Sequence, residues 1–498
     1  MSSSSLNEEA KGDSTGTAQR GAADRTNVGF VRSVNLRTAV AINMTQMCGI
    51  GPFITIPLMV AAFGGPQAIL GWIAGALLAL ADGLIWAELG AAMPGAGGTY
   101  IYLREAFQYR TGRLMPFIFT WTAVLFIPLI MSTGINGLVS YLGYLWPNMT
   151  WWQIDLVSFA LTGVVLFALY RRIESIGILS NVLFVIMLIS IGTVIVASFT
   201  HFNPTLAFSY PSNAFTLDSH FFGGLGAGLI IGIYDYLGYN TTAYMGAEVR
   251  NPGRVVPWSI MISIFGMMLL YLALNIGVMG VVPWQVVAKS NSVASLVLET
   301  AWGKGISSVV TVLILITAFA SVFAGLLGGS RVPYNAARDG VFLRQFGKLH
   351  PRYHFPHVAL IVMCIITAVA SILPLGTIIA ILTAVIVIVQ ALGQVAALTV
   401  LRRRQPDLKR PYRMWLYPLF SILALIGWVY VFVSSGLSGT QFILPIWTNP
   451  MLMAVAWTVL GIIAYLFWAR FVEHTWPFGP KEIKEEYLER PVESEASA

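Results

Sequence analysis

The chain has 498 residues, of which 57% are hydrophobic and 10% are charged, and its net charge is +7. A soluble protein would carry about 25% charged residues, so the composition excludes an ordinary soluble enzyme. The positive charge would suit a nucleic-acid-binding protein. The basic residues are instead distributed over short segments between apolar ones, so no nucleic-acid partner is expected.

Apolar segments of about 20 residues, each long enough to cross a bilayer, recur from residue 36 to residue 472. They predict an all-α integral membrane protein with twelve transmembrane helices and no cleavable signal peptide. The predicted spans are 36–63, 67–93, 115–144, 152–170, 174–199, 222–246, 257–281, 306–329, 356–374, 377–401, 412–435 and 450–472.

The basic residues predict the orientation of these spans. If the N-terminus is cytoplasmic, 27 of the 29 Lys and Arg residues fall in cytoplasmic segments, and only Lys289 and Lys304 do not. Cytoplasmic loops of membrane proteins carry such an excess. Both termini are therefore expected in the cytoplasm, and the location is a plasma membrane, either a bacterial inner membrane or a eukaryotic cell membrane. Residues 1–35 and 476–498 are expected to be cytoplasmic tails, the first of them disordered.

The first span is interrupted near its middle by Gly49-Ile50-Gly51-Pro52-Phe53. Glycine weakens a helix, and proline lacks a donor N–H and collides with the preceding turn. Irregular backbone at membrane depth is tolerated only where protein or a watery cavity surrounds it. The break therefore indicates a binding site, although the glycines alone could also serve close helix packing.

The sixth span contains a second interruption. It opens with several glycines and continues as Tyr234-Asp235-Tyr236-Leu237-Gly238-Tyr239-Asn240. Two broken helices in corresponding positions are typical of a transporter with an inverted repeat. Residues 36–220 would form the first five-helix repeat and residues 221–404 the second, with helices 1 and 6 broken. Residues 405–475 would add two peripheral helices, the eleventh and twelfth.

Three stretches at span boundaries resemble the amino acid–polyamine–organocation transporter family. They are residues 49–53 in the first span, residues 88–89 and 94–107 at and after the end of the second, and residues 246–254 after the sixth. Residues 336–340 after the eighth span are a weaker fourth match. The resemblance implies the fold of ten core helices and the secondary transport of amino acids or amines by alternating access.

The same resemblance implies where a substrate binds. Family members hold an amino-acid carboxylate on free backbone amides at the first break, which here belong to Gly49, Ile50 and Gly51. Pro52 is a departure because it removes one donor. The remaining candidate substrate-binding residues are Gln46, Met47 and Cys48 before the break, whose carbonyls could accept from an amine, and Tyr234, Asp235, Leu237, Gly238 and Asn240 by analogy.

Two acidic residues lie inside predicted spans. A charged side chain at mid-bilayer costs roughly 2.5–3.5 kcal/mol on insertion scales and usually marks an ion, proton or substrate path. Asp235 could pair with a substrate ammonium group or bind the coupling proton, or it could be a neutral acid of the core. Asp82 resembles an acid of plant-type polyamine carriers, and a second carboxylate would suit a dication. It could equally be a proton relay or a packing residue.

These two acids, Asp82 and Asp235, are the coupling candidates, and the proton is the expected coupling ion. Certain proton-coupled relatives carry a Lys in helix 5 that replaces a sodium ion, but residues 181–190 contain none, and Met187 lies at the matching place. Residues 145–152 lack the Cys of heavy-chain-linked relatives, so no disulfide-linked heavy chain is expected.

No metal or cofactor is expected either. Cys48 and Cys364 lie within spans, and the histidines of one cytoplasmic loop, His350, His354 and His357, are interpreted as solvated because no further ligand joins them.

The expected function is a proton-coupled symporter of amino acids or polyamines that lies in the lipid bilayer. One alternative is a sodium-coupled or exchange-type carrier of neutral amino acids. Another, of a different class, is a sensor that binds an amino acid without transporting it, although neither tail offers an evident signalling domain. An enzyme is not expected, because the chain shows no phosphate-binding glycine loop and no nucleophile–base motif.

Overall fold

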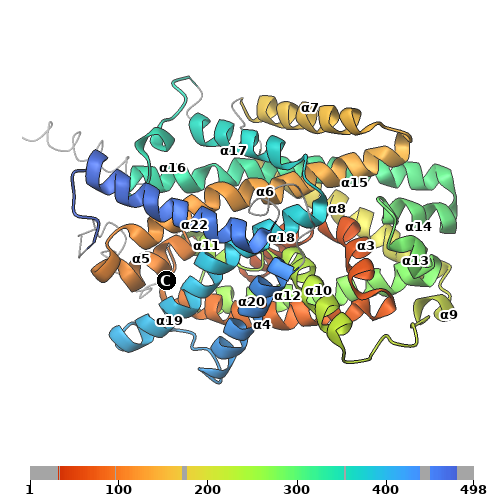
Figure 1. The fold of residues 1–498 in the computed structure, drawn as a ribbon, viewed down its shortest axis with the longest axis horizontal. Helices are drawn as coiled ribbons and strands as arrows, with labels where there is room; N and C mark the ends of the chain where they lie inside the picture. Colours follow the sequence, from red (N-terminus) through yellow and green to blue (C-terminus); the bar gives the residue numbers. More distant parts are fainter. Residues whose placement is uncertain are drawn as a thin grey trace, which may run out of the picture.

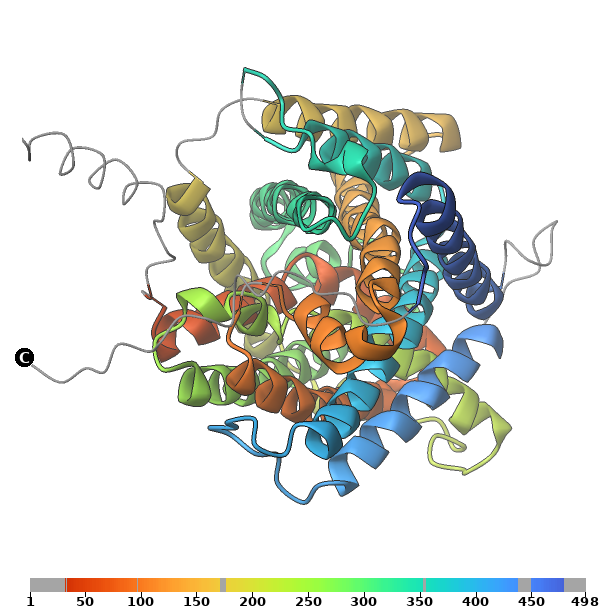
Figure 2. The ribbon, with the colours of Figure 1, turned by 90° about the vertical axis from the view of Figure 1, so that its left-hand side faces the viewer.

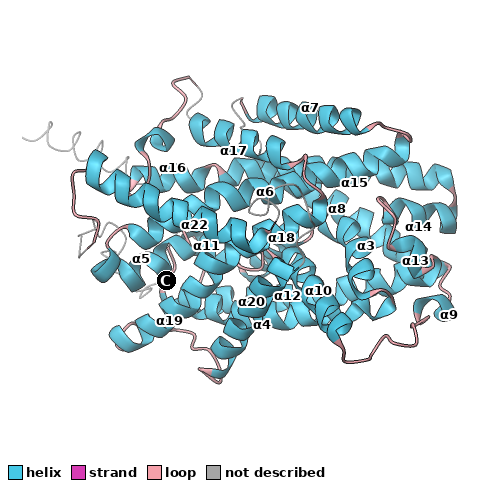
Figure 3. Cartoon of the chain, in the orientation of Figure 1, coloured by secondary structure: helices cyan, strands magenta, loops and turns pink. Residues whose placement is uncertain are grey.

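The computed structural model describes residues 32, 34–95, 97–170, 176–352, 355–437 and 449–478, and of α8 the side chains from residue 185 onward. Most of both predicted tails, Ala96 of the second family stretch, side chains 181–184 and His354 therefore lie outside the described residues. The described part is helical, and its β-type pairing is a single bridge between Val34 and Val249. Figure 3 shows helices joined by loops of varied length, among them long ones before α10 and between α19 and α20.

The first half of the chain contains α2 (Leu36–Met47), α3 (Gly51–Phe63), η1 (Pro66–Ala68), α4 (Ile69–Ala92), α5 (Thr99–Thr111), α6 (Leu114–Leu145), α7 (Trp151–Leu169), α8 (Ile176–Thr200), α9 (Pro204–Ala207), α10 (Ser219–Tyr236), α11 (Thr241–Tyr244) and η2 (Gly246–Glu248). The second half contains α12 (Pro252–Val281), α13 (Trp284–Val287), α14 (Val293–Trp302), α15 (Lys304–Gly329), α16 (Arg331–Arg338), η3 (Arg344–Gly347), α17 (His357–Ala370), α18 (Leu375–Ile386), η4 (Val387–Ala391), α19 (Leu392–Arg404), α20 (Leu419–Leu437), α22 (Pro450–Phe467) and η5 (Trp468–Val472).

Each of the twelve predicted spans contains one of these helices. Within the described residues, eight stretches are long and apolar enough to cross a membrane, or nine if α2 and α3 form one bent span. α17 has only 14 residues, and α10 ends early, at Tyr236. The chain is thus a multi-pass membrane protein, while the count of twelve and the two repeats stay predictions.

Side-chain caps set several helix starts. The side chains of Asn35, Asp218 and Asn449 accept hydrogen bonds from backbone amides in the first turns of α2, α10 and α22. Such caps satisfy amides that have no partner within the helix. In lipid this matters more than in water, because an unpaired backbone group there costs several kcal/mol.

The helices pack in two groups around the breaks. α4 lies against α10, α12 and α20, while α6 lies against α15, α17 and α18. Figure 1 shows α6 and α15 running alongside each other. α7 lies at the periphery in both Figure 1 and Figure 2, and exposed apolar side chains such as Trp151 and Phe167 suit contact with lipid.

Both predicted breaks are present. α2 and α3 meet at an angle of 53°, and Pro52 occupies the first turn of α3, where a missing N–H costs nothing. α10 ends at Tyr236, and residues 237–240, which we call the linker, lead into α11. Gly238 of the linker has a φ of 116°, and a Cβ there would lie 2.7 Å from the Cβ of Gln46. The two breaks are therefore in direct contact.

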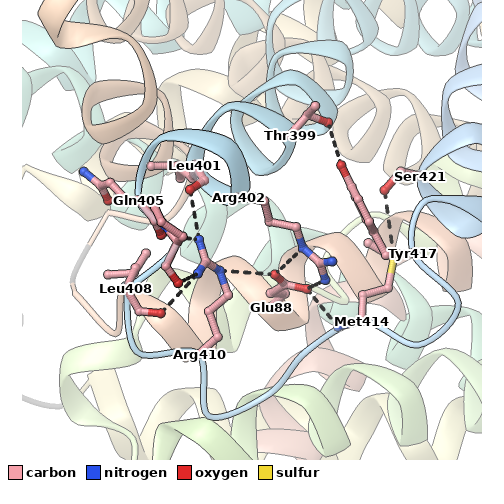
Figure 4. A network of polar contacts seen from close by, with 11 residues as sticks. Glu88, Thr399, Leu401, Arg402, Gln405, Leu408, Arg410, Met414, Tyr417 and Ser421 are labelled. Atoms are coloured by element: carbon pink, nitrogen blue, oxygen red, sulfur yellow. Dashed lines mark hydrogen bonds and ion pairs between the residues drawn. The ribbon is translucent and has the colours of Figure 1, made fainter.

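A buried ionic network ties the end of α4 to α19 and the loop that follows it (Figure 4). Glu88 accepts hydrogen bonds from Arg402 Nε at 2.8 Å and from the amide of Met414 at 2.8 Å, and its carboxylate forms an ion pair with Arg410 Nε at 3.5 Å. Arg410 also donates to the carbonyls of Leu401 and Gln405, which end α19. Burial lowers the pKa of Arg410, and the Glu88 carboxylate opposes that shift. This network anchors α4 against helices outside the broken pair.

Candidate functional site

A cavity of about 60 Å³ lies where the α2–α3 break faces the end of α10. Its walls come from α2, the break, α6, α10, the linker and α15. The lining residues are Gln46, Met47, Gly49, Ile50, Gly51, Ile130, Met131, Thr133, Gly134, Tyr234, Asp235, Leu237, Ser321 and Val322.

Most of the candidate binding residues line this cavity. Gln46, Met47, Gly49, Ile50, Gly51, Tyr234, Asp235 and Leu237 do so, whereas Cys48, Gly238 and Asn240 do not. Cys48 is only 1% exposed, in the core behind the break. Gly238 packs on Gln46, and Asn240 precedes α11. The structure thus brings eight of the eleven positions together and places three just outside.

The start of α3 presents free backbone donors. Within the described part of the chain, the amides of Gly49, Ile50 and Gly51 have no hydrogen-bond acceptor, and Pro52 has no N–H. The first amides of a helix are unpaired, and its dipole is positive at this end. Together they form a site for an anion such as a carboxylate.

Asp235 lies beside these donors. It is 2% exposed, and its Oδ2 lies 2.5 Å from the hydroxyl of Thr55, which also lies 2.9 Å from the carbonyl of Gly51. One hydroxyl proton cannot serve both acceptors fully, so a proton on Asp235 would complete the pairing. Oδ1 has no partner among the described residues. Gly51 allows this approach, because a Cβ there would collide with Oδ1.

Tyr271 of α12 holds the two breaks together. Its hydroxyl lies 2.8 Å from the carbonyl of Met47, at the end of α2, and 2.9 Å from the carbonyl of Asp235, near the end of α10. Both carbonyls belong to last turns, where no intrahelical donor is available. The two broken helices therefore share the single hydroxyl proton of Tyr271.

Sequence reasoning missed the contribution of α6 and α15. Thr133 of α6 pairs with the hydroxyl of Tyr234 at 2.7 Å, and Ser321 of α15 faces Gly49. The available signal was weak, because each helix carries several Ser and Thr residues and nothing in the sequence distinguishes Thr133 or Ser321 from the others. Apolar walls come from Ile130, Met131 and Val322.

Asp82 lies outside this cavity. Its Oδ2 accepts a hydrogen bond from Tyr239 of the linker at 2.5 Å, and its Oδ1 accepts one from Trp428 of α20 at 3.0 Å. It is 2% exposed. Whether it contributes to the binding of a dication stays a prediction.

The cavity is closed on one side and reachable on the other. Toward α14, Ile50 and Phe53 are buried, and Tyr141 bridges Phe53 and Ala294 through hydrogen bonds of 3.2 Å each. Toward α2, the side chain of Gln46 is exposed and Leu237 is half-buried. The cavity therefore lies nearer the surface on the side of α2 than on the side of α14.

Metal-binding clusters are absent from the part of the chain that the structure describes, where no three His, Cys, Asp or Glu side chains group together. The rings of His350 and His357 lie 5.7 Å apart, centre to centre. Cys48 and Cys364 are free thiols.

Comparison with known proteins identifies the family. The model of a family described as amino acid permease matches residues 34–463. The chain belongs to this family. Membership confirms the resemblance to the amino acid–polyamine–organocation transporters and identifies the permease as a transporter and not an enzyme.

Several relatives align with most of the permease. The branched-chain amino acid permease BcaP of Bacillus subtilis is 25% identical, over 86% of this chain and 92% of its own. The serine/threonine exchanger SteT of Bacillus subtilis is 23% identical, over 83% of this chain and 93% of its own. The Asc-type amino acid transporter 1 of Mus musculus is 28% identical, over 82% of this chain and 78% of its own.

Proposed function

We propose that the protein is a proton-coupled symporter of apolar, zwitterionic amino acids that works by alternating access. The observation that carries this proposal is the set of three unpaired amides, from Gly49 to Gly51, beside the buried carboxyl group of Asp235. The amides would hold the substrate carboxylate. The carbonyls in the last turn of α2 other than that of Met47, which Tyr271 already contacts, would hold the ammonium group at the negative end of the helix dipole.

The walls favour an amino acid over a polyamine. Asp235 is the one acidic residue among the lining residues, while Ile50, Ile130, Met131 and Val322 form apolar walls. A polyamine needs several counter-charges and no anion site, whereas a zwitterion needs one site of each kind. The names of the relatives, which include a branched-chain amino acid permease and a serine/threonine exchanger, agree with a neutral amino acid.

In this proposal Asp235 carries the coupling proton. The hydroxyl of Thr55 already has the Gly51 carbonyl as an acceptor, so a proton on Asp235 gives both groups a partner. If the N-terminus is cytoplasmic, the exposed side of the cavity at Gln46 would face the cytoplasm, and in this proposal the substrate leaves on that side.

Uptake into proteoliposomes tests this proposal. Substrates are first found by the thermal stabilisation of purified protein with individual amino acids. We expect the wild type to accumulate substrate when the outside is acidified, and Asp235→Asn to lose this accumulation while it still exchanges substrate across the membrane. Accumulation driven only by a sodium gradient would contradict the proton coupling.

Two other outcomes would support the alternatives. If Asp235→Asn loses substrate binding and exchange as well, Asp235 holds the ammonium group directly, as in an exchange-type carrier. If the wild type binds amino acids but moves none under any gradient, the protein is a sensor.

A further inference from the structure

The carboxylate of Asp82 joins three elements that are far apart in sequence. Asp82 lies on α4, Tyr239 lies in the linker after α10, and Trp428 lies on α20. Tyr239 donates its hydroxyl to Oδ2 at 2.5 Å, and the indole of Trp428 donates to Oδ1 at 3.0 Å. All three side chains are at most 2% exposed. A buried carboxylate with a donor on each oxygen is well satisfied.

This environment differs from that of Asp235. Tyr239 and Trp428 each donate a proton to Asp82 and so each needs an acceptor. Only the ionised form of the carboxyl group accepts at both oxygens and donates no proton itself. A proton on Oδ1 would face the indole N–H of Trp428, which cannot accept it. A proton on Oδ2 could be donated to the phenol oxygen of Tyr239, but the phenol's own proton would then lose its acceptor. Asp82 therefore accepts hydrogen bonds from both partners when it is ionised and loses one of these hydrogen bonds when it is protonated.

The groups that face Asp82 offer no other charge in the described part of the chain. The linker contributes the phenol of Tyr239, and α11 contributes that of Tyr244. From α12, Ile260 and Ile264 pack beside the neighbouring Gly83. α20 contributes the neutral indole of Trp428, and α4 itself contributes that of Trp86. The two phenols are thus the titratable neighbours, and the carboxylate has no basic partner.

We propose that Trp428 and Asp82 form a latch that positions the linker, and that α20 is therefore a working part of the transport cycle and not a peripheral addition. The latch acts on the substrate site through the linker, since Tyr239 is two residues from Leu237, which lines the cavity. Gly238, between them, packs on Gln46 and on the amide of Met47. Protonation of Asp82 leaves one of the two donors, Tyr239 or Trp428, without its acceptor and so loosens the linker. The proposal rests on the transport function proposed above.

Trp428→Phe tests the latch, because it keeps an aromatic ring and removes only the indole donor. Trp457→Phe on α22 is the matched control, since that indole also donates a hydrogen bond, to the carbonyl of Trp121 at 3.3 Å. Loss of a hydrogen bond to a charged group shifts an equilibrium about tenfold or more. We expect Trp428→Phe to lower the maximal transport rate about tenfold with KM within about twofold, and to flatten its pH profile.

A double-mutant comparison shows whether the two residues act together. Asp82→Asn should produce the same loss as Trp428→Phe, and the double variant should lose little more, because both changes open one latch. Losses that multiply, or a Trp428→Phe variant with the rate and pH profile of the wild type, would overturn the proposal.

A chemical readout keeps this test separate from the test of transport. Cys48 lies directly after Met47 and is buried, and Cys364 of α17 is an internal reference that is also buried. Release of the linker should raise the alkylation rate of Cys48 about tenfold in Trp428→Phe and leave Cys364 unchanged. An unchanged Cys48 rate contradicts the latch even if the protein transports nothing, whereas failure of wild-type transport contradicts the proposed function alone.

Discussion

The hydroxyl of Thr55 lies 2.5 Å from Oδ2 of Asp235 and so joins the two broken helices inside the membrane. Thr55 is fully buried on α3, and Asp235 lies in the last turn of α10. The same hydroxyl lies within hydrogen-bonding distance of the Gly51 carbonyl. The contact therefore links the carboxyl group to the backbone that carries the free amides.

Thr55→Val should weaken proton-driven accumulation. The change keeps the shape of the side chain and removes the hydroxyl, so Asp235 loses its hydrogen-bonding partner in the described structure. A hydrogen bond to an ionisable group contributes about 1.5–3 kcal/mol. The pH at which the initial uptake rate is half-maximal should therefore differ from that of the wild type. Initial rates measured over a series of pH values test this. Thr55→Ser retains the hydroxyl and should keep the wild-type profile.

Gly51→Ala should abolish substrate binding without unfolding the protein. A Cβ at residue 51 would collide with Oδ1 of Asp235, so the carboxyl group would be displaced from the free amides. Gly163→Ala on α7 is the matched control, because nothing lies within 4 Å of the added Cβ. Substrate-induced thermal stabilisation should vanish in the first variant and persist in the second. Stabilisation that persists in Gly51→Ala would show that the substrate binds elsewhere.

Tyr271→Phe should destabilise the junction of the two breaks. It removes the donor shared by the carbonyls of Met47 and Asp235, and a buried unsatisfied group costs about 1–3 kcal/mol. We expect a lower Tm and a lower transport rate. Tyr430→Phe is a suitable comparison, because its hydroxyl donates to the carbonyl of Phe222 in a more exposed position. Equal effects of the two variants would argue against a special role for Tyr271.

Glu88→Gln should lower the Tm of the protein clearly. Glu88 is 1% exposed and faces two arginines, and removing one partner of a buried ion pair costs about 3–5 kcal/mol. Arg344→Gln breaks a pair with Glu473 in which the arginine is 77% exposed, so it should cost at most about 1 kcal/mol. Thermal unfolding in detergent compares the two variants. A Tm of Glu88→Gln close to that of the wild type would show that the network does not stabilise α4.

The sequence alone determined the class of protein, the place of both breaks and the presence of an acidic residue, Asp235, at the second of them. A Gly-Pro sequence destabilises a helix, and a carboxylate within an apolar span is unfavourable in a bilayer. Both effects are independent of the helices that pack against the span, so the sequence reveals them. The free amides of Gly49, Ile50 and Gly51 were predictable for the same reason, since Pro52 can only begin a new helix.

The tertiary structure alone decided which helices face these features. α6 and α15 are apolar around most of their circumference, so nothing in their sequences indicated that Thr133 and Ser321 would reach the cavity. Trp428 lies 346 residues from Asp82, on a helix predicted to be peripheral. In a bilayer, apolar periodicity does not distinguish lipid from a neighbouring helix, because both are equally apolar. Contacts between distant helices therefore depend on how the whole chain packs, which no local pattern encodes.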